Sequence, residues 1–143
     1  MRERSQGSTA RDAGTVRKQY HFWPSSDGAG LDAWDVDRLI VLANGLPARE
    51  VALDDIAEID SAYWFDDSRE RATVRKVVEH VRLIEEVDLS HPIIRGPDGR
   101  VMDGMHRIAR ALLDGRTTIS AVQLDTLPAP DYRNCHPHDL PYE

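Results

Sequence analysis

The sequence predicts a small α+β domain in which a mixed β-sheet is flanked by helices. Three segments, at residues 33–44, 73–84 and 105–114, carry apolar residues at helical spacing. Shorter segments with the character of strands lie between and after them, at residues 51–56, 93–102 and 118–124. The chain has 143 residues, of which 41% are hydrophobic and 30% charged, and this predicts one soluble domain.

The N-terminal third predicts an arm followed by the start of the domain. Residues 1–19 are polar and unpatterned, which predicts a flexible arm and places the domain at residues 20–143. The aromatic residues at 20–23 favour an anchor packed against the core over a platform that stacks on a base. Apolar residues between Val36 and Ala43 predict the first helix, which Gly45 ends.

The middle of the chain predicts a strand, a loop and the longest helix. Residues 51–56 have the pattern of a short strand, and residues 58–71 mix aromatic and acidic side chains as surface loops do. In that loop the run of aromatics at 63–65 favours an anchor over a base-stacking site. Thr73 is a suitable N-cap for a helix that follows. We expect its core-facing stripe to be formed by Val74, Val77, Val78, Val81 and Ile84.

The last third predicts a hairpin, a helix and a final strand. Ile93 and Ile94 form the first strand of the hairpin, the sequence GPDG its turn, and residues 100–102 its second strand. The helix that follows ends at Gly115 and is expected to turn an apolar face inward. The members of that face are Ile108, Ala109, Ala111 and Leu112. Residues 118–124 alternate as a strand, and the proline-rich residues 125–143 predict coil wrapped around a core at 51–124.

Charge and composition restrict the classes of partner. Residues 1–19 carry a net charge of +3 and the remainder −10, within a total of −7. Duplex DNA binding depends mainly on neutralising phosphates, so an acidic body disfavours it. The longest apolar run, at residues 39–43, is far shorter than the roughly 18–20 residues of a membrane span. With the single cysteine, Cys135, these features predict a cytoplasmic protein without a disulfide framework or a membrane partner.

The segment at residues 101–115 is the best candidate for a site. A strand leads directly into Asp103 and Gly104, where a helix begins, and the free N–H groups of a helix N-terminus attract anions. Gly104 allows close approach of a ligand, and His106 and Arg107 lie in the first turn, where a guanidinium binds phosphate oxygens in pairs. Asp103 is placed either to cap the helix or to hold Mg²⁺ beside phosphates. The alternative is a capped helix with solvated His106 and Arg107.

These residues carry a resemblance to the ParB/sulfiredoxin superfamily, over about half of the chain. The matching strings are Asp88 with Pro92-Ile93-Ile94, then D-G-x-H-R-x-x-A beginning at Asp103, and Gly115 before the final strand. Members of this superfamily bind nucleotides such as ATP, ADP or CTP. The resemblance implies that Gly104, Met105, His106 and Arg107 form the turn that contacts the phosphates.

The resemblance also implies contributions from the preceding helix and loop. Sulfiredoxins direct polar side chains of the earlier helix at the same phosphates, and the matching positions here are Thr73, Lys76 and His80. At about 100° per residue these three share one side of the helix, at the border of the valine stripe. Free serine kinases, which also carry D-G-x-H-R, use a loop carboxylate as the base toward a hydroxyl. That loop here offers acids that include Asp67 and Glu70, and these join Asp103 as candidate catalytic residues.

Departures from these relatives limit the reaction. Met105 occupies the position of the sulfiredoxin cysteine, and a thioether cannot perform its chemistry. Only 19 residues follow Leu124, too few for the DNA-binding and dimer modules of partition proteins. We therefore expect a protein that binds ATP or ADP with Mg²⁺ and transfers a phosphoryl group to a small hydroxyl-bearing substrate. The alternatives are a nucleotide sensor without turnover and a ParB-like nuclease associated with DNA.

Overall fold

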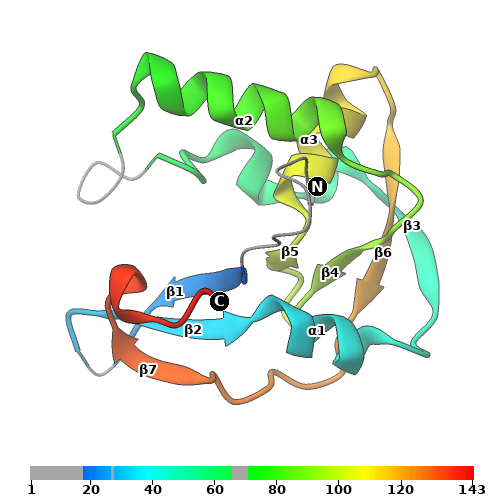
Figure 1. The fold of residues 1–143 in the computed structure, drawn as a ribbon. Coiled ribbons are helices and arrows are strands. Elements are labelled where there is room, and N and C mark those ends of the chain that lie inside the picture. Colours follow the sequence, from blue (N-terminus) through cyan, green and yellow to red (C-terminus); the bar gives the residue numbers. More distant parts are fainter. Residues whose placement is uncertain (1–17, 27, 66–70) are drawn as a thin grey trace.

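A computed structural model describes residues 18–26, 28–65 and 71–143 of the chain. In that part the chain forms two β-sheets and three α-helices, as predicted for a small α+β domain (Figure 1). Residues 1–17 of the predicted arm lie outside the described residues. Lys18 is held in place, because its ammonium lies 2.9 Å from Asp35 and 3.1 Å from Asp37. No helix within the described ranges is long and apolar enough to cross a bilayer.

The larger sheet is mixed, as predicted. Its hairpin lies where the sequence indicated, and the parallel pairing between its two central strands makes the sheet mixed. The strand predicted at residues 51–56 starts three residues earlier and is followed by a 3₁₀ turn, Leu53–Asp55. The strand order is β3 (Ala48–Ala52), β6 (Thr118–Gln123), β4 (Ile93–Arg95) and β5 (Val101–Asp103).

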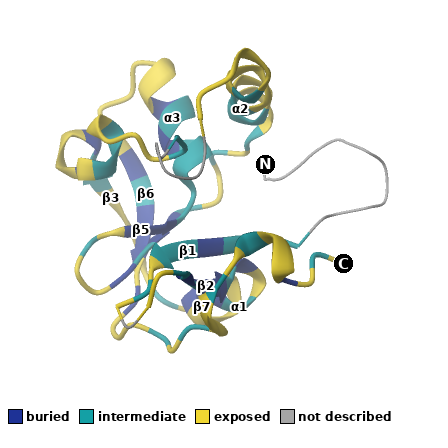
Figure 2. Ribbon diagram, turned by 90° about the vertical axis from the view of Figure 1, so that its left-hand side faces the viewer, coloured by how far each residue is buried: buried dark blue, intermediate teal, exposed yellow. Residues whose placement is uncertain are grey.

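Both faces of this sheet are covered, because its strands alternate two sets of apolar side chains. Ile93 and Val101 point to one face, where they pack against Ile108 of α3 (Met105–Leu113). Ile94 and Met102 point to the other face, where they pack with Leu39 of α1 (Val36–Ala43) and with a buried tryptophan, Trp34. The sheet therefore stands at the centre of the domain, between α3 on one side and α1 on the other (Figures 1 and 2).

The smaller sheet was not predicted. It is antiparallel and joins the start of the domain to the tail, in the order β1 (Tyr20–Pro24), β2 (Leu31–Asp35) and β7 (Tyr132–Cys135). The prediction of a helix from residue 33 is wrong by three residues, because Ala33 and Trp34 are buried in β2 and α1 begins only at Val36. The prediction of coil for residues 125–143 is also wrong in part, since β7 and a 3₁₀ turn, Pro137–Asp139, lie there.

The longest helix, α2 (Val74–Glu86), begins as predicted, and the Thr73 hydroxyl accepts a hydrogen bond from the backbone N–H of Lys76 at 3.2 Å. Its expected core-facing stripe is wrong. Every residue of the helix has some exposure, and the four valines are 44% to 83% exposed. The less exposed face is formed by Lys76, His80, Leu83 and Ile84. The apolar face of α2 thus lies on the surface of the domain (Figure 2).

The prediction for α3 is half correct. Ile108 and Ala111 are fully buried against the sheet, but Leu112 is 52% exposed. Only one narrow side of this helix is buried, because the sheet covers Ile108 and Ala111, which are three residues apart. A second apolar side of α3 remains at the surface.

One imidazole is buried beneath the smaller sheet. His21 in β1 is 6% exposed, and its ring packs edge-on against Trp23 at 4.9 Å between centroids, with Trp34 5.9 Å away. Within the described residues its Nε2 has no hydrogen-bond partner. Burial, followed by the nearby Arg100 guanidinium, lowers the pKa of His21 to about 3. The folded protein therefore holds this ring neutral, whereas the unfolded chain takes up a proton near pH 6.5.

This difference predicts that the domain loses stability as the pH falls below about 6.5. The unfolded state binds the proton more tightly, so each pH unit between about 6.5 and 3 costs about 1.4 kcal/mol of unfolding free energy. We expect His21→Phe to remove this loss, because phenylalanine keeps the ring packing and has no proton to take up. Urea unfolding at pH 7 and pH 5 measures it, with about 2 kcal/mol less loss in the variant.

His138→Gln provides the control for this measurement, because the His138 side chain is 83% exposed. It is expected to keep the full acid dependence of the natural chain. An unchanged dependence in His21→Phe would show that the buried ring is not the group responsible.

Candidate functional site

The candidate site is built around the turn from β5 into α3. Gly104 is the N-cap of α3 and has a φ of +112°, which residues with a side chain rarely adopt. A Cβ at this position would lie 2.6 Å from Cγ2 of Ile93. The glycine is thus required by the backbone and by its packing on β4. The N-cap is Gly104, which makes no side-chain capping hydrogen bond, so the alternative in which Asp103 caps the helix is wrong.

Asp103 is instead paired with Arg107. Nη2 of Arg107 lies 3.0 Å from Oδ2 of Asp103, and it also donates to the carbonyl oxygen of Pro92 at 3.3 Å. The two side chains are only 14% and 18% exposed, so the pair is largely removed from solvent. The Arg107 charge is therefore balanced by Asp103 at the start of α3. This contact ties the helix to β5 and to the segment that leads into β4.

The helix α2 brings a second imidazole to this turn. Nδ1 of His80 lies 2.8 Å from Nε2 of His106, which is in the first turn of α3. One turn further along, the guanidinium of Arg110 donates to the carbonyl oxygens of Glu85 at 2.8 Å and Ile84 at 3.4 Å, at the end of α2. These contacts keep the two helices side by side with the same direction. The polar face of α2 therefore meets the first turn of α3.

An indole ring stacks on both imidazoles. Trp64 lies 4.3 Å from His80 and 4.5 Å from His106, measured between ring centroids, and is within 17° of parallel to each. Phe65 meets the edge of His80 at 5.3 Å. The predicted loop thus supplies an anchor, as its aromatic run favoured. The sequence placed this loop over the surface of the site, but it did not predict that the indole stacks on the two imidazoles.

The contact between the imidazoles limits their charge. One ring must donate a proton and the other accept it, because a neutral imidazole has one donor and one acceptor nitrogen. Protonating both facing nitrogens would set two N–H groups against each other. The pair therefore carries at most one positive charge while this contact holds.

The other predicted residues are placed around this centre or lie outside the description. Thr73 and Lys76 precede His80 on α2, and Lys76 belongs to the same, less exposed face as His80. Met105 is partly buried against the core cluster that contains Ile93, so its side chain has a packing role. The candidate catalytic acids Asp67 and Glu70 lie outside the described residues. Within the described ranges there is no cluster of three or more histidine, cysteine or carboxylate side chains that could hold a metal.

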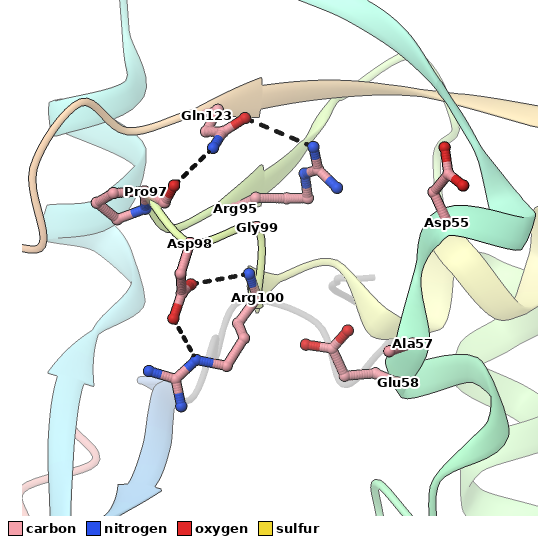
Figure 3. A pocket seen from close by; sticks show the side chains of 9 residues that line it. All are labelled: Asp55, Ala57, Glu58, Arg95, Pro97, Asp98, Gly99, Arg100 and Gln123. Atoms are coloured by element: carbon pink, nitrogen blue, oxygen red, sulfur yellow. Dashed lines mark hydrogen bonds and ion pairs between the residues drawn. The ribbon is translucent and has the colours of Figure 1, made fainter.

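A cavity of about 390 Å³ lies elsewhere, between the hairpin turn and the 3₁₀ segments that follow β3 (Figure 3). Arg95 and Gln123 line one side of it, and Asp55 and Glu58 the other. None of the predicted site residues that the structure describes lines this cavity. Glu58, one of the loop acids, accepts a hydrogen bond from the backbone N–H of Val101 at 2.8 Å. Its carboxylate thus holds β5 in place, away from the two imidazoles.

The site is therefore defined by its own geometry. It consists of the first turn of α3, the Asp103–Arg107 pair, and the imidazoles of His80 and His106 beneath the Trp64 indole. Comparisons with protein-family models, with curated proteins and with solved structures find no match to this chain.

Proposed function

We propose that this chain binds ATP or ADP with Mg²⁺ at the first turn of α3 and transfers a phosphoryl group to a small hydroxyl-bearing substrate. The observation that carries the proposal is the 2.8 Å contact between His80 and His106. It unites two sets of residues that the resemblance in sequence assigns to one phosphate site. They are far apart in the chain and come from different helices.

The first turn of α3 and the polar face of α2 supply the attraction for an anion. The first N–H groups of a helix have no partner within it, and the N-terminal end carries a partial positive charge. Lys76 adds positive charge on the facing helix, and the His80–His106 pair starts neutral, so that it can take up one proton. Asp103 would divide its carboxylate between Arg107 and Mg²⁺. Mg²⁺ in proteins is often held by one or two carboxylates besides phosphate oxygens.

The transfer itself joins the substrate oxygen to the terminal phosphorus and breaks the bond from that phosphorus to the bridging oxygen. The hydroxyl proton must leave the substrate, and the His80–His106 pair is a described group able to accept it. The role of the pair is then to hold that proton, while Trp64 keeps one face of both rings from solvent. The loop acids Asp67 and Glu70 stay the alternative bases.

Nucleotide binding predicts a rise in melting temperature. A ligand at 100 times its Kd adds about 2.7 kcal/mol of stability, or several degrees for a domain of this size. We expect this shift with ATP or ADP and Mg²⁺ and none with duplex DNA. Transfer of label from γ-labelled ATP to a panel of small hydroxyl compounds then separates an enzyme from a sensor. A shift with DNA that vanishes at high salt, with none from any nucleotide, would reverse the proposal.

Lys76→Ala is expected to weaken ATP binding more than AMP binding. The side chain lies on the face of α2 that meets α3, where a point charge acts on the terminal phosphates that AMP lacks. Arg82→Ala on the exposed side of the same helix is the matched control and should change neither affinity. Calorimetric titration of both nucleotides measures the difference. Equal losses for ATP and AMP, or an equal effect at Arg82, would remove α2 from the site.

Arg107→Ala is expected to lower both stability and nucleotide affinity. Removing the guanidinium leaves the largely buried Asp103 without its partner, at a cost of about 1–3 kcal/mol in unfolding free energy. It also sets an unbalanced negative charge beside the phosphates. The double variant Arg107→Ala with Asp103→Asn should recover part of the lost stability, as measured by urea unfolding, because no unpaired carboxylate is left. Strictly additive losses would show that the two side chains act independently.

A further inference from the structure

The outer face of α2 continues onto α3 as one apolar surface. Four valines of α2 and two leucines of α3 are exposed, with a summed exposure of more than three complete aliphatic side chains. Soluble monomers rarely leave a continuous apolar area of this size uncovered. The set is Val74, Val77, Val78, Val81, Leu112 and Leu113, and we call it the valine surface.

A groove of about 500 Å³ runs between the two helices within this surface. Val81 and Ile84 line it from α2, and Ala109 and Leu112 from α3. The groove is apolar apart from Glu85. It has the dimensions to accept a row of aliphatic side chains from another helix.

The distribution of charge along α2 indicates what kind of helix can pack against this groove. Its first turn contains the basic residues Arg75 and Lys76 and no acid, and its last turn contains Glu85 and Glu86 and no base. This arrangement opposes the preference of a single helix, which favours acids at its N-terminus and bases at its C-terminus. An antiparallel neighbour with the same sequence reverses the balance, because each basic end then lies beside an acidic end.

We propose that the valine surface binds a second copy of this chain, with the two α2 helices antiparallel across a two-fold axis. A pairing that sets Val77 against Val81 of the second copy has its centre at residue 79. At a rise of 1.5 Å per residue, Arg75 then lies about 6 Å from the centre and Glu85 of the second copy about 9 Å from it, on the same side. Long side chains bridge that difference, and the two-fold axis repeats the ion pair.

The charge pair provides a test in which the monomer and the dimer respond oppositely. Arg75→Glu and Glu85→Arg each improve the charge at one end of the isolated helix, so neither should destabilise the monomer. In the dimer each creates two repulsive contacts. We expect each single variant to raise the dimer Kd about tenfold, and the double variant to return it close to the original value. Sedimentation equilibrium of the full chain from about 1 to 100 µM measures this, with thermal unfolding to report monomer stability.

Two further variants identify the surface. Val78→Glu in the middle of the valine surface should leave a monomer of 16.1 kDa at every concentration. Val41→Glu is the matched control, since Val41 is a 72% exposed valine on α1 and should leave the dimer intact. The proposal is overturned if the natural chain stays monomeric. It is also overturned if Val41→Glu breaks the dimer instead, or if the charge swap fails to restore association. Nucleotide titration of the same variants tests the candidate site separately.

Discussion

The tight turn at Gly104 is the constraint on which the rest of the arrangement depends. The chain must pass from β5 into α3 beside Ile93, and the contact leaves no space for a Cβ at this point. Because the turn is fixed against the central sheet, the first residues of α3 have fixed positions as well. Arg107 then reaches Asp103 and the carbonyl of Pro92, and His106 projects toward α2. A larger residue at 104 would move the helix axis and separate all of these contacts at once.

The long helix α2 has no fully buried side chain, and hydrogen bonds join it to α3. The last carbonyls of α2 accept hydrogen bonds from Arg110, its middle is joined to α3 through His80, and its four valines point outward. An amphipathic helix normally turns its apolar side to the core. Here the apolar side of α2 faces outward as part of the valine surface, and the opposite side, with His80, contacts the first turn of α3. A single helix can thus serve a site and an association surface on two different faces.

Patterns in the sequence predicted the elements that local signals define. The hairpin at Pro92 to Asp103, the start of α2 at Thr73 and the strand β6 all lie where turn residues, a cap and alternation placed them. The smaller sheet was missed because β7 lies in a proline-rich tail and pairs with β2 about 100 residues away, which no local pattern reveals. The prediction that the valine stripe of α2 faces the core was wrong for a related reason. Periodicity identifies an apolar stripe, but it does not indicate whether the stripe meets the same chain or another one. At the site, the motif beginning at Asp103 predicted the turn, whereas the Arg107 pairing and the stacking of Trp64 depend on tertiary contacts.

The pairing of β2 with β7 has a consequence for how the protein is made. β2 lies between a strand from the first residues of the domain and one from the last, and the backbone N–H of Lys18 donates to the carbonyl oxygen of Tyr142 at 2.9 Å. During synthesis β1 and β2 emerge from the ribosome long before the segment that completes their sheet. Until then the edge of β2 that pairs with β7 is open. The larger sheet also waits for β6, which ends at Gln123, shortly before β7 begins at Tyr132, so both sheets are completed by the last part of the chain.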